Sequence, residues 1–194
     1  QLRDHKNNIV QEEWLNDGRL YTVARRDLHV ALVNCARRSG VEILTSSPVE
    51  GADPSGVLKL ASGEERPADL VLGTDGVFSK VRDSLGLAQE VTDLGDGCGR
   101  HMIPRNDDDP VGTAWETWSG GRRIGIVPCH PEWTYIFVCS PVSDARATDQ
   151  RPFDRETWIE TFPQFRSQLE RIPEYPEGRF ATFHDVRTYA WRRG

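Results

Sequence analysis

The clearest chemical feature of the sequence is a turn that follows a continuous apolar run. The run Leu70–Leu72 does not alternate with polar residues, which is typical of a strand covered on both faces. Asp75 and Gly76 follow it, and Ser79 is placed to cap a short helix that ends at Gly86. Ligands bind at the carboxyl ends of strands in α/β sheets, where glycine lets the backbone approach a cofactor. The spacing fits a cofactor-binding turn and, equally, an ordinary connection in a nucleotide-binding fold.

A second candidate is Arg25, which stands with Arg26 at the start of a predicted helix. A cation at a helix N-terminus is disfavoured by roughly 0.3–1 kcal/mol, so another interaction should hold it there. Beside the free backbone N–H groups, the guanidinium could bind a phosphate or a planar polar ring. The alternative is a surface arginine neutralised by Asp27. The helix is predicted over residues 26–39 because apolar residues recur at helical spacing, which indicates a buried stripe of Leu28, Ala31, Leu32, Cys35 and Ala36.

Composition argues against several other classes of function. The 194 residues carry a net charge of −6, which disfavours general nucleic-acid binding. No run approaches the roughly 20 apolar residues of a membrane helix, and the first residues lack the apolar core of a signal peptide. The four cysteines form no C-x-x-C pair, which favours a reduced, cytoplasmic protein. Cys98 with His101, and Cys129 with His130, do not have the spacing of zinc ligands, so we expect no metal.

Turn signals divide the remaining sequence into short elements. Beyond Gly86 the sequence becomes rich in glycine and aspartate, and a second domain is expected to begin near residue 90. The run Asp107–Asp109 is expected to be a solvated loop, and Pro163 should interrupt a helix over 153–172. The predicted strands and turns are a hairpin over 12–23 with its turn at 16–18, a strand at 41–44, a meander at 48–52 and 57–61, strands at 113–117, 123–127 and 134–139, and a last strand at 179–183.

Several separate motifs together resemble the single-component FAD-dependent aromatic hydroxylases, the para-hydroxybenzoate hydroxylase class. The matching segments, in the family's order, are Tyr21–His29, Gly40–Ile43, Gly63, Ala68–Gly76, Ser79 and Arg82. Residues 83–86 and 127–129 are also similar to the pyridine-carboxylate oxygenase branch. The resemblance implies that Arg25, Asp75, Gly76 and Arg82 bind FAD, and that the Asp-Gly motif also serves NAD(P)H. It assigns no catalytic nucleophile to a side chain of this sequence.

Candidate substrate residues lie on the predicted strands of the second domain. Arg123 opens one strand and Tyr135 lies in the next, so a hairpin could place both on one face. The resemblance implies that Arg100, Arg123 and Tyr135 line the pocket of an anionic aromatic ring, with arginine binding the carboxylate and tyrosine the ring hydroxyl. Solvent-facing strand residues are the alternative. Phe183 is a further candidate for the pocket's apolar wall, and core packing is its alternative.

Two motifs of the family are absent from the sequence: the N-terminal G-x-G-x-x-G and a later Gly-Asp motif. We therefore expect an internal fragment of a longer enzyme, α/β plus α+β in class. A partial Rossmann-like FAD-binding domain is expected at 20–90, and an antiparallel-sheet substrate-binding domain at 1–19 and 91–194.

The expected function is FAD-dependent hydroxylation of a small aromatic or heteroaromatic acid with NAD(P)H and O₂. Alternatives are a non-catalytic substrate-binding module or a related flavoprotein epoxidase, reductase or halogenase. An apolar face where further Rossmann strands would pack is expected to cause self-association of the isolated chain.

Overall fold

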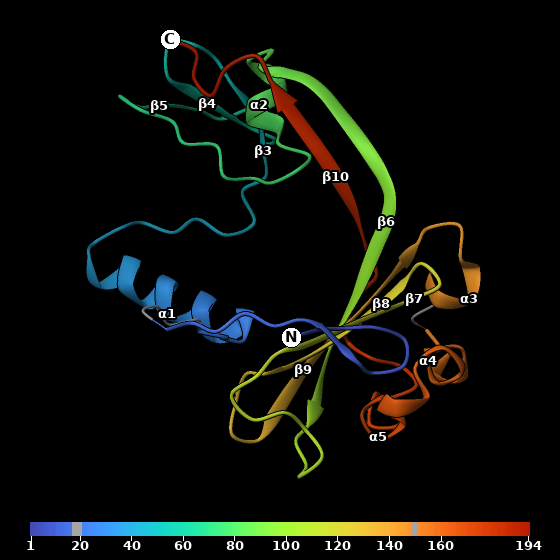
Figure 1. Ribbon diagram of the computed structural model, residues 1–194. Coiled ribbons are helices and arrows are strands. Elements are labelled where there is room, and N and C mark those ends of the chain that lie inside the picture. The colour runs from blue at the N-terminus through green and yellow to red at the C-terminus, as the bar shows by residue number, and fades with distance from the viewer. Residues whose placement is uncertain (17–20, 149–150) are drawn as a thin grey trace. The chain divides into compact units, whose positions relative to one another are not determined.

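The computed structural model describes residues 1–16, 21–148 and 151–194, and it divides the chain into two compact units. Unit one contains Gln1–Leu32 and Gly95–Phe183, and unit two contains Val33–Leu94 and His184–Gly194. Each unit has its own sheet (Figure 1). The elements are β1 (Leu2–Arg3), β2 (Ile9–Gln11), α1 (Arg25–Arg38), β3 (Val49–Ala52), β4 (Val57–Leu60), β5 (Glu65–Pro67), α2 (Lys80–Ser84), β6 (Ala88–Pro104), β7 (Trp115–Ser119), β8 (Arg122–Pro128), β9 (Trp133–Pro141), α3 (Ala145–Thr148), α4 (Arg155–Thr161), the 3₁₀ turn η1 (Pro163–Phe165), α5 (Arg166–Leu169) and β10 (Ala181–Thr188).

The main sheet has the strand order β10-β6-β9-β8-β7-β1-β2. Strands β6, β9, β8 and β7 are antiparallel neighbours, and β1 joins β7 in parallel. The strands predicted at 113–117, 123–127 and 134–139 are confirmed as β7, β8 and β9, with small shifts of their ends. The mixed α/β character and the antiparallel sheet are therefore as the sequence predicted.

The core of unit one forms between one face of this sheet and the short helices after β9. Ile124 and Ile126 of β8 pair with Val138 and Ile136 of β9, and all four are buried. Because side chains alternate along a strand, these residues share one face, against which Trp158 and the other buried residues of α4 and α5 pack. The predicted interruption of the helical segment is confirmed, since Pro163 begins the 3₁₀ turn between α4 and α5.

Asp109 corrects the expectation that 107–109 is a solvated loop. Its side chain is fully buried and forms an ion pair with Arg171. The hydroxyl of Thr134 donates to Asp109 Oδ2 at 2.6 Å, and the amide of Gln168 donates to Oδ1 at 3.3 Å. Asp107 is exposed, as predicted. Three consecutive aspartates look alike in a sequence, and the cation that buries one of them lies far along the chain.

Unit two contains the three-stranded antiparallel sheet β3-β4-β5, which confirms the predicted meander. Helix α2 packs on β3 through Ser84, whose hydroxyl accepts from Ala52 N at 2.9 Å and donates to Ala52 O at 3.0 Å. The helix begins and ends as predicted: the Ser79 hydroxyl accepts from Arg82 N at 3.0 Å, and Gly86 follows the helix with a φ of 62°.

Several apolar segments are less buried than their patterns predicted. Residues 41–44 and 70–72 form no strand, and Leu70 and Leu72 are 71% and 75% exposed. Helix α1 is confirmed, but its expected buried stripe is not, because Leu28 and Leu32 are exposed. A parallel strand needs neighbouring strands and a helix stripe needs a packing partner, and the described residues supply neither in these places. The turn predicted at 16–18 falls largely outside the described residues, and its flanks at 12–15 and 21–23 are not strands.

The long strand β6 was missed by sequence analysis. Glycine and aspartate, which have low strand propensity, dominate its middle. From Asp96 onward it pairs with β9 along the whole of that strand, so cross-strand pairing decides its conformation.

Replacing Asp109 should leave the partly buried Arg171 guanidinium without its carboxylate. We expect Asp109→Asn to lower the free energy of unfolding by about 3–5 kcal/mol at neutral pH. Urea denaturation followed by tryptophan fluorescence measures this. The matched control Asp107→Asn, on an exposed side chain, should change stability by less than about 0.5 kcal/mol. An effect of Asp109→Asn within the control's range would contradict the network's role.

The stability difference between the wild type and Asp109→Asn should depend on pH. Desolvation raises the pKa of Asp109, but hydrogen bonds from Arg171 and Thr134 lower it by more, so its pKa lies below the ordinary value. A depressed folded-state pKa contributes stability that is complete above the unfolded-state pKa and is lost as pH falls through the folded value. The stability difference between the wild type and Asp109→Asn should therefore be constant above roughly pH 5 and shrink below about pH 4.

Candidate functional site

The candidate substrate residues lie on one face of the main sheet, opposite the core. Met102 of β6 and Val127 of β8 are both paired with Tyr135 of β9. Residues two apart share a face, so Arg100 lies on the side of Met102, and Arg123 on the side of Val127. The structure thus brings Arg100, Arg123 and Tyr135 together on what we call the polar face, formed by Cys98, Arg100, Met102, Arg123, Tyr135, Phe137 and Cys139.

Arg123 is already held by two neighbours within unit one. Its guanidinium donates to Asp96 Oδ2 at 2.8 Å, and its carbon Cζ lies 5.2 Å from the centre of the Trp118 ring. These three residues line a cavity of about 610 Å³ together with His5 and the β7–β8 turn. Sequence analysis missed Asp96 and Trp118, because neither stands near Arg123 in a recognisable motif.

Tyr135 is partly buried on the polar face and can act as a hydrogen-bond donor. Burial raises the pKa of its phenol, and the nearby Arg100 guanidinium offsets this only in part. The phenol is therefore protonated at neutral pH. Its ring centre lies 6.2 Å from that of Phe137, within the range of an aromatic contact. Phe183 is partly buried in β10, and β6 separates that strand from the strand of Tyr135.

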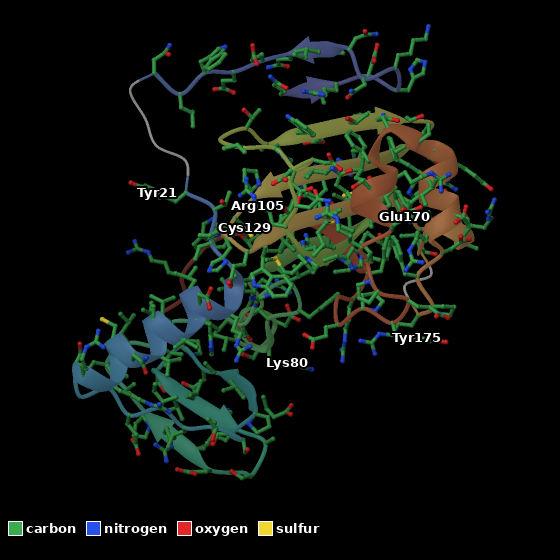
Figure 2. The ribbon with its side chains drawn as sticks, turned by 90° about the horizontal axis from the view of Figure 1, so that it is seen from below. Tyr21, Lys80, Arg105, Cys129, Glu170 and Tyr175 are labelled. Atoms are coloured by element: carbon green, nitrogen blue, oxygen red, sulfur yellow. The ribbon has the colours of Figure 1, made fainter. Side chains whose placement is uncertain are left out.

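The first turn of α1 lies beside one end of the polar face. The Thr22 hydroxyl donates to the carbonyl of Pro128 at 2.6 Å, which attaches the segment before α1 to the end of β8. Burial raises the pKa of Cys129, and the nearby negative charge of Asp27 raises it further. Figure 2 shows Cys129 at the strand ends, beside the segment that leads from Tyr21 into α1. Arg25, which is exposed, therefore begins its helix near the end of the polar face that carries Tyr135.

The Asp-Gly turn belongs to unit two, where it gathers the other candidate cofactor residues. Asp75 Oδ2 accepts from the backbone N–H of Lys80 at 2.7 Å and of Val81 at 3.3 Å, and Oδ1 accepts from the Ser79 hydroxyl. Partial burial opposes ionisation of Asp75, but the Ser79 and backbone hydrogen bonds outweigh it and lower the pKa. Asp75 is therefore an ionised carboxylate fixed at the start of α2.

Gly76 and Arg82 complete this turn. Gly76 has a φ of 87°, and no atom lies within 4 Å of the place where a Cβ would stand. Arg82 donates to the carbonyl of Val77 at 2.7 Å and pairs with Asp83. Both line a cavity of about 680 Å³ in unit two, which is within the usual size of small-molecule sites.

The remaining candidates for metal chemistry do not come together. Cys98 and His101 lie three positions apart on β6, and so on opposite faces of the sheet. Within the described ranges, no group of three or more His, Cys, Asp or Glu side chains is placed to hold a metal ion. No helix among the described residues is long and apolar enough to cross a membrane.

Comparison with known proteins connects this arrangement to flavin enzymes. No protein-family model matches the chain. A probable 2-heptyl-3-hydroxy-4(1H)-quinolone synthase of Rhodococcus erythropolis is 35% identical over 91% of this chain and 47% of its own length. A putative FAD-dependent monooxygenase of Bacillus subtilis is 32% identical over 78% of the chain and 44% of its own length. The chain thus spans about half the length of the curated relatives it matches.

Solved structures agree with these relatives. The tetrameric form of 2-methyl-3-hydroxypyridine-5-carboxylic acid oxygenase covers the whole chain with 33% identity and a TM-score of 0.87, over 53% of its own length. A Klebsiella pneumoniae protein crystallised with FAD and uric acid covers 84% of the chain, and 43% of its own length, with a TM-score of 0.69. At 19% identity, that second likeness concerns the fold alone.

Asp75 should have a structural role that can be measured without any cofactor. We expect Asp75→Ala to remove the acceptor for two N–H groups of α2 and to destabilise the helix by about 0.5–2 kcal/mol. Hydrogen exchange at the amides of Lys80 and Val81 should accelerate accordingly. Asp69→Ala, on an exposed side chain of the same unit, is the control and should leave these rates unchanged. Equal rates in the two variants would show that Asp75 does not hold these two N–H groups.

Proposed function

The chain is related in sequence and fold to FAD-dependent monooxygenases of the aromatic hydroxylase class, and from this relationship we propose that it forms one part of an FAD site together with a substrate-binding face. The substrate we propose is a small aromatic or heteroaromatic acid, and the reductant is NAD(P)H. One observation carries the proposal: two arginines and a protonated phenol share a sheet face, and the start of α1 lies at its end.

The residues of unit two fit a large cofactor. The open space at Gly76 lets a ring or sugar approach the backbone without meeting a side chain. Asp75 is ionised and its orientation is fixed by α2, so it can accept hydrogen bonds from hydroxyl groups of the cofactor. Arg82 adds a cation to the wall of the cavity that Gly76 also lines. We therefore propose Asp75, Gly76 and Arg82 as the residues of unit two that hold FAD. The relationship to FAD-dependent monooxygenases is what supports a role of Arg25, in unit one, in FAD binding.

When bound, FAD supplies the redox chemistry, namely electron transfer from NAD(P)H and activation of O₂. The side chains of this chain then have binding and orienting roles. Arg100 and Arg123 attract a carboxylate, and a planar guanidinium can bind both of its oxygens. Tyr135 donates its phenol proton to an oxygen on the ring, which fixes the orientation of the substrate on the polar face.

The curated relatives indicate a second class of substrate. Several of them are named for a quinolone with an alkyl chain, which is uncharged, whereas the related oxygenase of known structure is named for a pyridine carboxylic acid. The ion pair between Asp96 and Arg123 favours the uncharged quinolone class, since it neutralises one of the two arginines. Binding measurements with a charged and an uncharged ring distinguish the two classes.

FAD binding can be tested with a pair of matched glycine variants. Gly76 and Gly63 have almost the same positive φ, 87° and 85°, and both have open space at the Cβ position. Gly76→Ala and Gly63→Ala should therefore cost similar backbone strain, but only Gly76 lines the proposed site. In a titration with FAD followed by visible absorption, we expect Gly76→Ala to weaken binding by about tenfold and Gly63→Ala to leave it unchanged. A chain that takes up no FAD, or equal affinities for both variants, would contradict the proposed role of this turn.

Substrate binding can be tested independently of the cofactor. We expect Arg123→Ala to weaken binding of hydroxybenzoate or a pyridine carboxylate by roughly 10- to 100-fold, because a charge-assisted hydrogen bond contributes about 1.5–3 kcal/mol. Calorimetric titration measures this. The control is Arg166→Ala, since Arg166 is exposed on α5 and its ion pair, among the described residues, is with Glu170 of the same segment.

The ligands themselves separate the two substrate classes. Unchanged affinity of Arg123→Ala for the carboxylates would remove Arg123 from the site. Preferential binding of an uncharged 4-quinolone by the wild type would favour the second class.

A further inference from the structure

Two cysteines face each other across strands β6 and β9. Cys98 pairs with Cys139 in the register of these antiparallel strands. Both side chains are buried and both are free thiols. They belong to the polar face, and Arg123 of β8 is the partner of Cys139 on its other side. The row Cys98, Cys139, Arg123 therefore crosses three adjacent strands of unit one.

Backbone hydrogen bonds at the two ends of the β6–β9 ladder show whether Cys98 and Cys139 form a hydrogen-bonded or a non-hydrogen-bonded pair. Val142 N donates to Gly95 O at 2.9 Å, and Arg105 N donates to Glu132 O at 2.9 Å. These two pairs are hydrogen-bonded pairs, and the two types alternate along an antiparallel ladder. Cys98 is three positions from Gly95 and seven from Arg105. Because both offsets are odd, counting from either end makes Cys98 and Cys139 a non-hydrogen-bonded pair.

The distance in such a pair suits a covalent bond between the sulfurs. Opposite residues of a non-hydrogen-bonded pair have Cα atoms about 4.5 Å apart, with side chains closer than in the other pair type. Disulfides have Cα separations of about 4.4–6.8 Å. The bond can therefore form without a shift in strand register.

The surroundings of the pair favour reaction at one sulfur. A hydrogen bond from Cys139, and then the charges of Arg100 and Arg123, lower the pKa of Cys98. The same hydrogen bond, with burial, raises the pKa of Cys139. Cys98 is therefore the sulfur of the pair with the lowered pKa, and the thiolate is the nucleophilic form of cysteine.

We propose that Cys98 and Cys139 form a redox-active dithiol that a peroxide converts to a cross-strand disulfide. The Cys98 thiolate attacks one oxygen of hydrogen peroxide, the O–O bond breaks, and hydroxide leaves, which takes up a proton to become water. The product is a sulfenic acid at Cys98. The Cys139 sulfur then attacks the Cys98 sulfur, the S–O bond breaks, and the proton from Cys139 leaves with the hydroxyl group as a second water. The two sulfurs together lose two electrons, and the peroxide gains them.

The bond would join β6 to β9 directly between Arg100 and Arg123. It would remove the partial negative charge of the Cys98 sulfur from beside these guanidinium groups and fix the separation of the two strands there. This inference does not rest on FAD binding or on the identity of a substrate, since the oxidant is added in the test.

The test is thiol mapping of the unmodified chain. The chain is treated with an equimolar amount of hydrogen peroxide, its free thiols are alkylated in denaturant, and its peptides are identified by mass spectrometry. We expect a peptide pair joined through Cys98 and Cys139 and a mass of the intact chain that is lower by two hydrogen atoms. Dithiothreitol should reverse both changes. The proposal would be overturned if Cys98 and Cys139 were still fully alkylated after peroxide treatment. It would also be overturned if they carried oxygen adducts without a joined peptide pair.

Variants provide the matched controls. The double variant Cys35→Ser/Cys129→Ser retains only the facing pair and should give the same joined peptide as the wild type. In that background, Cys139→Ser should instead accumulate a sulfenic acid at Cys98, which a dimedone probe detects. Dimedone labelling of Cys98 in this Cys139→Ser variant should be at least several-fold higher after peroxide treatment than in the same variant without peroxide. Equal labelling with and without peroxide would contradict Cys98 as the attacking sulfur.

Discussion

The antiparallel register of β6, β9 and β8 is the constraint on which the rest of unit one depends. It assigns every side chain of these strands to one of two faces, and a shift by one residue would exchange them. On one face, Ile124, Ile136 and their neighbours bury against the short helices. The opposite face is then left with Arg100 and Tyr135. The apolar face is buried by the hydrophobic effect, to which each side chain adds a small amount. This burial thereby determines where Arg100 and Tyr135 lie, although these two side chains contribute little to stability.

Residues 70–72 and helix α1 illustrate the opposite case, in which an apolar pattern is present without the buried contacts that would satisfy it. Leu70 and Leu72 have the apolar continuity of a doubly covered strand, yet they are exposed. Helix α1 has an amphipathic stripe with no buried residue among those described. A helix makes its backbone hydrogen bonds within its own segment, whereas a parallel strand exists only through hydrogen bonds to neighbouring strands. The helix is therefore present, and the strand is not.

The same distinction explains what the sequence could and could not predict. Helix α2 was predictable because its cap at Ser79 and its stop at Gly86 are local signals. The hairpin expected between the strands of Arg123 and Tyr135 allowed both to lie on one face, and the register of β8 and β9 places them there. Strand β6 was not predictable, because its glycines and aspartates are strand residues only through pairing with β9. Nor was the burial of Asp109, since its partner Arg171 is distant in the sequence and no local pattern indicates the pair.

The contact between Arg123 and Asp96 determines how an anion could reach the polar face. The pair is partly exposed, and ion pairs of this kind contribute only about 0–1 kcal/mol. A ligand carboxylate can therefore displace Asp96, or share the Arg123 guanidinium with it, at small cost. Stacking on Trp118 holds the guanidinium in place during that exchange, because it does not depend on the aspartate. An uncharged ring would leave the ion pair intact and would rely on Tyr135 and apolar contacts instead. If this face binds the substrate as proposed, its selectivity depends on whether the ligand brings a charge that can replace that of Asp96.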